Sequence, residues 1–144
     1  MLAELIESWR INAAEALSLI VDDESSVRDY VTAIVEREQF RTIEAENAIR
    51  AAHIIENFGD AIDLIVSDIQ IPGGDGMTLA CSVRESFPTV PFVLMSGFAE
   101  PGRETHPSIS FEFVQKTFSP ETLLTAIGKA MKMMELRKQA AGTD

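Results

Sequence analysis

Four apolar segments of this chain each end in side chains that could take part in chemistry. Asp22 and Asp23 follow the first segment, Asp68 ends the second, Ser96 the third and Lys116 the fourth. Apolar runs of this length are typical of buried strands in a parallel sheet, whose carboxyl ends share one edge. The side chains are therefore expected to converge there. Carboxylates that share a pocket repel each other unless a cation holds them, and a few hard oxygen ligands suit Mg²⁺.

Such a pocket could transfer a phosphoryl group. One carboxylate would attack phosphorus, while Mg²⁺, an ammonium and a hydroxyl neutralise and orient the transferring oxygen atoms. Asp68 is the best candidate for the nucleophile, because it stands alone on its strand at the centre of the sheet. A Pro/Gly turn from Pro72 to Gly76 follows it, as is common where a strand leads into a helix.

Strand-like and helix-like segments alternate along the chain. Strands are predicted near 17–21, 40–45, 63–68, 90–96 and 111–116, and helices near 26–35, 47–58, 77–87 and from 119 onwards. Pro101, Gly102 and Pro107 should leave only a short or irregular helix between 97 and 110. The alternation predicts an α/β fold, a doubly wound five-stranded parallel sheet in the flavodoxin-like order 2-1-3-4-5 with helices on both faces.

Local signals predict where these helices begin and end. Ser26 to Asp29 has the pattern of a capping box for the first helix, and Tyr30 belongs to the apolar stripe that follows it. Gly59 is predicted to be the C-terminal cap of the second helix. The triplet Ser-Pro-Glu at 119–121 predicts the start of a long last helix.

Composition limits the class of protein. A length of 144 residues with 46% apolar residues suits one compact domain, and a formal charge of -11 argues against nucleic acid or an anionic membrane as a direct partner. The single cysteine, Cys81, excludes an internal disulfide framework. No apolar stretch approaches the length of a membrane span, and charged residues near the N-terminus argue against a secretory signal. A cytoplasmic protein is therefore expected.

The chemically active residues, in this order, resemble the response regulator receiver domain of two-component phosphorelay signalling. The resemblance covers roughly 17–134 and includes Pro72 and Gly76 after Asp68. It implies that Asp68 accepts a phosphoryl group from the phosphohistidine of a histidine kinase or a histidine phosphotransfer protein. The chain would be no enzyme, apart from self-catalysed phosphotransfer and autodephosphorylation at Asp68. Its signal would pass to an unknown downstream protein.

The resemblance also implies which residues would hold the metal. Asp23, Asp68 and the backbone carbonyl of Gln70 would ligate Mg²⁺, and Asp22 would act largely through water. Mg²⁺ is the one cofactor that these residues predict.

The same resemblance gives Ser96 and Lys116 the role of holding the phosphoryl oxygens, and Phe113 matches the aromatic switch position on the last strand. The sequence departs from the family at the residue after the lysine, which is usually a proline preceded by a cis bond and is Thr117 here. Because a cis bond before a residue other than proline costs about 2.5–4 kcal/mol, a trans Lys116–Thr117 bond is expected.

The two ends of the chain add apolar helical surface. Residues 1–16, with apolar positions at helical spacing from Leu2 to Trp9, are predicted to be an N-terminal helical extension, and 17–144 a receiver domain with a long C-terminal helix. This surface exceeds what one sheet face needs and favours a homodimer. Nothing after Met134 could form an output domain, so output is expected through protein contacts unless the chain is a fragment.

Two other classes of function remain open. A receiver-like interaction scaffold independent of phosphorylation is compatible with Thr117 and with the interrupted fourth helix. An Asp-dependent, Mg²⁺-dependent phosphatase would also use a nucleophile at a strand end, but it usually needs a second acid two residues later, where this chain has Gln70. Gln70 thus argues against the phosphatase, and the intact set Asp22, Asp23, Asp68, Ser96 and Lys116 argues against the scaffold. The phosphorylation-controlled module is therefore favoured.

Overall fold

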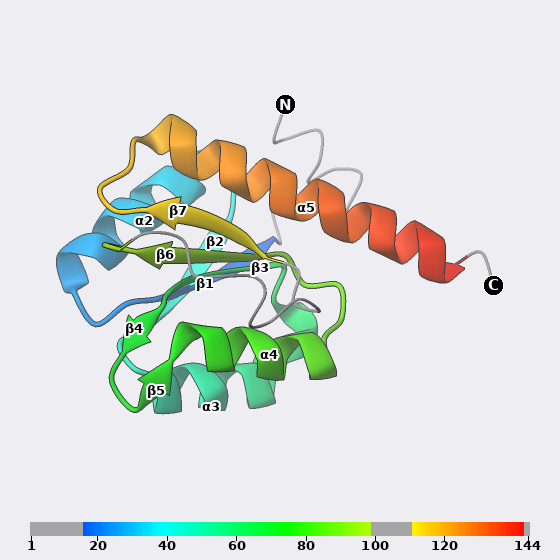
Figure 1. The fold of residues 1–144 in the computed structure, drawn as a ribbon, viewed down its shortest axis with the longest axis horizontal. Coiled ribbons are helices and arrows are strands. Elements are labelled where there is room, and N and C mark those ends of the chain that lie inside the picture. Colours follow the sequence, from blue (N-terminus) through cyan, green and yellow to red (C-terminus); the bar gives the residue numbers. More distant parts are fainter. Residues whose placement is uncertain (1–15, 99–110, 143–144) are drawn as a thin grey trace.

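A parallel five-stranded sheet forms the centre of the molecule (Figure 1). In the computed structural model, which describes residues 16–98 and 111–142, these strands are β1 (Leu17–Val21), β2 (Arg41–Ala45), β3 (Leu64–Asp68), β6 (Phe92–Ser96) and β7 (Glu112–Gln115). Their order is β2-β1-β3-β6-β7, and every pairing is parallel. The predicted fold and strand order are therefore confirmed, with β3 at the centre of the sheet.

Helices cover both faces of the sheet. The described helices are α2 (Ser25–Arg37), α3 (Ala48–Phe58), the short 3₁₀ helix η2 (Gly59–Ala61), α4 (Gly76–Ser86) and α5 (Pro120–Gly142). Apolar residues of α2 and α5 form one core with the sheet, and those of α3 and α4 form a second core on the opposite face. The last turns of α5 extend past the sheet (Figure 1). Among the described residues, no helix has the length and apolar character to span a membrane.

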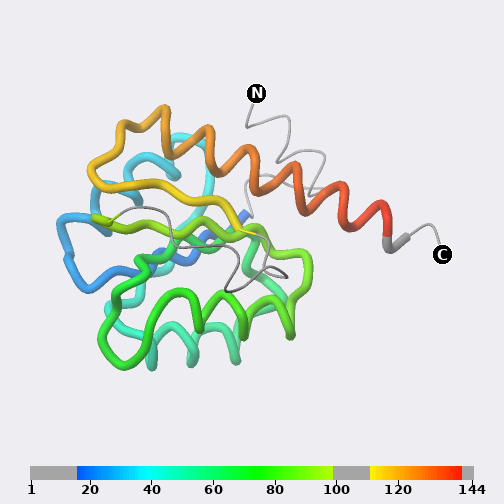
Figure 2. The backbone as a smooth tube through the Cα atoms, in the orientation of Figure 1, coloured from blue at the N-terminus to red at the C-terminus, as the bar shows by residue number. Residues whose placement is uncertain are grey.

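The carboxyl ends of the strands lie at one end of the molecule. The backbone trace shows the start of α2 and the turn between β7 and α5 together at this end (Figure 2). The predicted extension at 1–16 falls, except for buried Ala16, outside the described residues, as does the predicted irregular helix between 97 and 110 beyond Phe98.

One predicted helix boundary is wrong for an identifiable reason. α2 begins at Ser25 after Glu24, which makes no side-chain capping bond, because the Asp22 carboxylate fixes this turn by accepting the Glu24 N–H at 2.9 Å. The predicted end of α3 is confirmed, since Gly59 is its C-terminal cap, although Gly59 has a right-handed conformation (φ -53°) and leads into η2. A Cβ at Gly59 would meet the Phe87 ring, so glycine is present there for close packing. The predicted start of α5 is confirmed, since Ser119 Oγ accepts the Thr122 N–H.

The connection after Asp68 is a small antiparallel hairpin that the sequence did not indicate beyond a turn. It pairs β4 (Gln70–Ile71) with β5 (Gly74–Asp75), and Gly73 at its tip has φ +84°, a conformation that glycine adopts readily. The hairpin returns the chain to Gly76, whose N–H donates to the Ile69 carbonyl at 2.6 Å. Gly76 therefore packs directly against the backbone that carries Asp68.

Gly76→Ala should destabilise the protein, because a Cβ there would meet the Asp68 carbonyl oxygen and lie 2.9 Å from Ile69 Cα. Backbone atoms cannot move aside as a flexible side chain can, so we expect urea unfolding to show a loss of about 1–3 kcal/mol. Gly97→Ala is the matched control, since a Cβ at Gly97 meets nothing within 4 Å. Equal effects of the two substitutions would contradict the close-packing role of Gly76.

Candidate functional site

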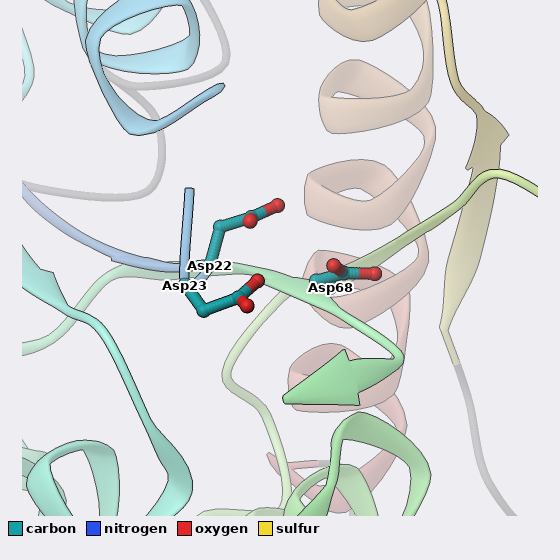
Figure 3. Close-up of side chains that lie close together, drawn as sticks. All are labelled: Asp22, Asp23 and Asp68. Atoms are coloured by element: carbon teal, nitrogen blue, oxygen red, sulfur yellow. The ribbon is translucent and has the colours of Figure 1, made fainter. Parts of the chain in front are cut away.

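Three carboxylates meet at the carboxyl ends of β1 and β3 (Figure 3). Asp22 and Asp23 follow β1, and Asp68 is the last residue of the neighbouring strand β3. One oxygen atom from each lies within 4.8 Å of the other two. Asp22 is fully buried and Asp68 is 7% exposed, whereas Asp23 is exposed to solvent. The sequence therefore placed these three groups together correctly.

Every oxygen atom of Asp22 accepts a hydrogen bond from the protein. Oδ1 accepts from the Glu24 N–H at 2.9 Å, Oδ2 from Lys116 Nζ at 2.8 Å, and the backbone carbonyl from Arg28 Nη1 at 2.8 Å. By contrast, the exposed Asp23 carboxylate accepts no hydrogen bond from the part of the chain that the structure describes. Asp22 is thus fixed by hydrogen bonds within the protein, whereas the Asp23 carboxylate is available to bind a ligand from solvent.

Lys116 joins the ends of three strands. Its Nζ donates to Asp22 Oδ2 at 2.8 Å and to Asp68 Oδ2 at 3.1 Å, and its N–H donates to the Ser96 carbonyl at 2.7 Å. An ammonium has three donors, so one remains for an incoming oxygen atom after these two bonds. The Lys116–Thr117 bond is cis, so the expected trans bond is wrong. That expectation rested on the preference of an isolated peptide bond, whereas contacts from distant strands fix Lys116.

Burial and charge shift the pKa values of both partners in this ion pair. Burial raises the pKa of Asp68 above its ordinary value, and repulsion from Asp22 adds to it, against the opposing effect of the hydrogen bond from Lys116. For Lys116, burial acts to lower the pKa, but hydrogen bonds to the two carboxylates and attraction to their charge outweigh it, and the pKa is raised. Lys116 is therefore favoured in its charged form, and added positive charge beside Asp68 would favour the ionised carboxylate.

The site fits a divalent cation such as Mg²⁺. Asp23 offers a solvent-facing carboxylate, and Asp68 Oδ1 accepts only a long hydrogen bond, 3.3 Å, from the Gln70 N–H. These are hard oxygen ligands on an open side of the pocket, and nearby acidic charge exceeds the one ammonium that the described residues supply. Asp22, with its oxygen atoms already engaged, would act on the metal through water, as the sequence analysis expected.

The other predicted site residues border this cluster. Ser96 ends β6, is 3% exposed, and its Oγ accepts the Phe98 N–H at 3.0 Å. Phe113 is half-buried on β7 and packs against the core on the α3 and α4 face. Gln70 is exposed at the start of the hairpin beside Asp68. No hydrogen bond joins the side chain of Ser96 to Asp68 among the described residues.

Two residues beside the site were missed by the sequence analysis. Arg28 Nη1 holds the Asp22 carbonyl while its Nε donates to Glu44 Oε1 at 2.9 Å, so it ties the end of β1 to β2. Tyr30 was assigned only to the apolar stripe of α2, but it is 41% exposed and its hydroxyl donates to the Phe118 carbonyl at 2.8 Å. The charge of Arg28 and the polar tip of Tyr30, both within the first two turns of α2, were the available signals.

Comparison with known proteins gives one consistent result. The model of the response regulator receiver domain family matches residues 18–128. Sensor kinase CckA of Brucella abortus (strain 2308) is 30% identical over 125 residues, which are 85% of this chain and 13% of that kinase. A putative NtrX-like response regulator of Rickettsia bellii (strain RML369-C) is 24% identical over 125 residues, 84% of this chain and 26% of the regulator. The chain thus spans 13% and 26% of the length of these two relatives.

Solved structures agree with this assignment. The beryllofluoride-activated receiver domain dimer of NtrC4 superposes with a TM-score of 0.72 at 27% identity, covering 82% of this chain and 98% of that domain. The shared fold, together with a family match over most of the sheet and its helices, identifies the family. This chain belongs to the response regulator receiver domain family.

Proposed function

We propose that this protein is a phosphorylation-controlled signalling module that accepts a phosphoryl group on Asp68. The observation that supports it most strongly is the bridge that Lys116 Nζ makes between Asp22 and Asp68, beside the solvent-facing Asp23. This combination provides a nucleophile, a fixed positive charge and a free metal ligand at one point.

The chemistry follows from the roles of these side chains. An Asp68 oxygen forms a bond to phosphorus, the bond from phosphorus to the donor's histidine nitrogen breaks, and that nitrogen keeps the electron pair. Lys116 uses its remaining donor to hold a phosphoryl oxygen, and Asp22 keeps the ammonium in place. Asp23, Asp68 and the carbonyl of Gln70 would hold Mg²⁺, which supplies charge neutralisation and orientation of the phosphoryl group when bound. Hydrolysis of the acyl phosphate at the same site would end the signal.

The proposed donor is a histidine kinase or a histidine phosphotransfer protein in the cytoplasm, and output passes through contacts with a downstream protein. Phosphotransfer profiling measures labelling of the protein by each histidine kinase of the host, with Mg²⁺ present and absent. It tests whether the protein accepts a phosphoryl group and which kinase is the donor. Rapid Mg²⁺-dependent labelling by one kinase is the expected result. Labelling by none of them, together with no labelling by acetyl phosphate, would favour the scaffold alternative.

The predicted homodimer stays a prediction; the exposed Leu136 of α5 and the NtrC4 receiver dimer support it.

Ser96 is expected to couple phosphorylation of Asp68 to a conformational change at Phe98 and Phe113. Its Oγ now accepts the Phe98 N–H, and a phosphoryl group with about two negative charges would draw the hydroxyl toward itself. This movement frees the Phe98 amide and vacates space that the half-buried Phe113 ring can fill. Beryllofluoride with Mg²⁺ should therefore shift the amide NMR signals of Ser96, Phe98 and Phe113 together.

Ser96→Ala should suppress the shifts at Phe98 and Phe113 and spare those around Asp68, because it removes the moving hydroxyl and leaves the acceptor intact. Wild-type protein without beryllofluoride gives the reference spectrum. If Phe113 stays fixed in the wild type while residues around Asp68 respond, the protein binds the phosphoryl mimic without this switch.

A further inference from the structure

We propose that Tyr30 is a positioning residue for Lys116. Its hydroxyl and ring tie α2 to the segment that carries the lysine, and so hold the Lys116 ammonium at Asp68. The proposal rests on the function proposed for Asp68. The contacts that support it, between Tyr30 and Phe118, lie outside the acidic cluster.

The segment in question is the four-residue connection 116–119 between β7 and α5. At its start, Lys116 is fixed by its N–H bond to Ser96 and by its two Nζ bonds. Two residues later, the Phe118 carbonyl accepts the Tyr30 hydroxyl at 2.8 Å, across 88 residues of sequence. Thr117 between these two points is exposed. Tyr30 therefore provides the second anchor of the segment.

A ring contact reinforces this anchor. The ring centroids of Tyr30 and Phe118 lie 5.9 Å apart at an interplanar angle of 48°. Phe118 packs in turn against the core between α2 and α5, together with Val27 of α2. Tyr30, Val27 and Phe118 line a shallow apolar pocket with Lys116 and Thr117. The position of Phe118, and with it the direction of the Lys116 main chain, is thus set by α2.

Small errors in the position of Lys116 should affect the reaction more than they affect stability. The ammonium must stabilise charge that develops on the transferring oxygen atoms, and such groups act only when they are held in the correct geometry. Asp22 and Asp68 restrain the tip of the side chain through two bonds, and the third donor of the ammonium must point at a phosphoryl oxygen. A fixed main chain then decides where the ammonium goes. Tyr30 supplies that fixation through its hydroxyl and its ring.

Tyr30→Phe tests this role, because it removes the hydroxyl and keeps the ring. With acetyl phosphate as the donor, we expect the rate of Asp68 phosphorylation at saturating donor to fall between about two- and tenfold, the range that corresponds to one lost hydrogen bond. The donor concentration at half-maximal rate and the affinity for Mg²⁺ should stay unchanged, since Tyr30 contacts neither. A small donor is necessary because a kinase could touch the exposed Tyr30 ring directly.

Thr42→Val is the matched control. It removes another hydroxyl that bonds to α2, because Thr42 Oγ1 donates to Glu36 Oε2 at 3.2 Å. Thr42 lies on β2, at the opposite edge of the sheet from β7, the strand that leads into Lys116. The control should leave the phosphorylation rate at the wild-type value. Equal loss of rate in both variants would overturn the proposal, because it would indicate a general effect of loosening α2.

A double-mutant cycle with Lys116→Ala shows whether Tyr30 acts through the lysine. Tyr30→Phe should slow the reaction in the presence of Lys116 and have no further effect in its absence. An equal loss in both backgrounds, or no loss in either, would overturn the proposal.

Hydrogen exchange separates this inference from the proposed function, because it needs no phosphoryl donor. Tyr30→Phe should speed exchange at the amides of Lys116 and Phe118 and leave those of β3 unchanged. If the wild type accepts no phosphoryl group, the proposed function fails, whereas faster exchange at these two amides still supports Tyr30 as the anchor of the Lys116 segment. Unchanged exchange would exclude that anchor.

Discussion

Asp68→Asn should lower phosphoryl incorporation from acetyl phosphate or a phosphorylated kinase by more than about a hundredfold, since a carboxamide oxygen is a poor nucleophile and loss of a nucleophile typically removes most of the rate. The amide has nearly the shape of the carboxyl group and can still accept a hydrogen bond from Lys116 Nζ, so the fold should be retained. Intact mass after incubation with Mg²⁺ measures the phosphoryl adduct directly, and circular dichroism checks the fold.

Asp60→Asn makes the same chemical change at an exposed position in η2, remote from the strand ends that form the site, and serves as the matched control. It should be phosphorylated at the wild-type rate. A full phosphoryl adduct on the Asp68→Asn variant would place the acceptor on another residue and would contradict the assignment of Asp68.

Asp23→Ala is expected to weaken Mg²⁺ binding by at least about tenfold, because even groups that only support a metal ligand cost this much when removed. Asp23 presents a solvent-facing carboxylate within 4.8 Å of Asp22 and Asp68, whereas the oxygen atoms of Asp22 are already engaged by the protein. Calorimetric titration with Mg²⁺ measures the affinity, and phosphorylation of the variant should lose most of its Mg²⁺ dependence.

Glu24→Ala is the control for charge alone. It removes an exposed acid one residue further along the chain, while the backbone N–H that Glu24 donates to Asp22 remains. We expect only a small change in Mg²⁺ affinity, because a solvated charge outside the ligand set is largely screened. Similar losses in the Asp23 and Glu24 variants would show that the cation responds to net charge and has no specific ligand at Asp23.

The sheet and the meeting of Asp22, Asp68 and Lys116 could be predicted from sequence for a simple physical reason. Continuous apolar runs mark strands that are buried on both faces, and in a parallel sheet the residues that follow such runs must share one edge. A polar residue that directly follows such a run is therefore expected to lie at that edge of the sheet. Charge alone calls for a cation, since carboxylates brought together repel each other, and the hard oxygen ligands are the reason to expect Mg²⁺.

Features that depend on contacts between distant segments could not be predicted in this way. The start of α2 is set by the Asp22 side chain, which replaces the expected capping box. Tyr30 fits the apolar stripe of α2, yet its hydroxyl reaches a carbonyl 88 residues away and its ring remains partly exposed. The same holds for Gly76, whose place in a turn was evident but whose packing on the Asp68 carbonyl was not.

The identity of the phosphorylated residue is the central point of the proposed function. An acyl phosphate on aspartate is reduced by borohydride to homoserine, a change that tandem mass spectrometry can place at a single position. Wild-type protein labelled in the presence of Mg²⁺, reduced and digested should carry homoserine at position 68. Homoserine at Asp22 or Asp23, phosphate on a residue other than an aspartate, or no modification under conditions that label a receiver domain of known activity would contradict the account.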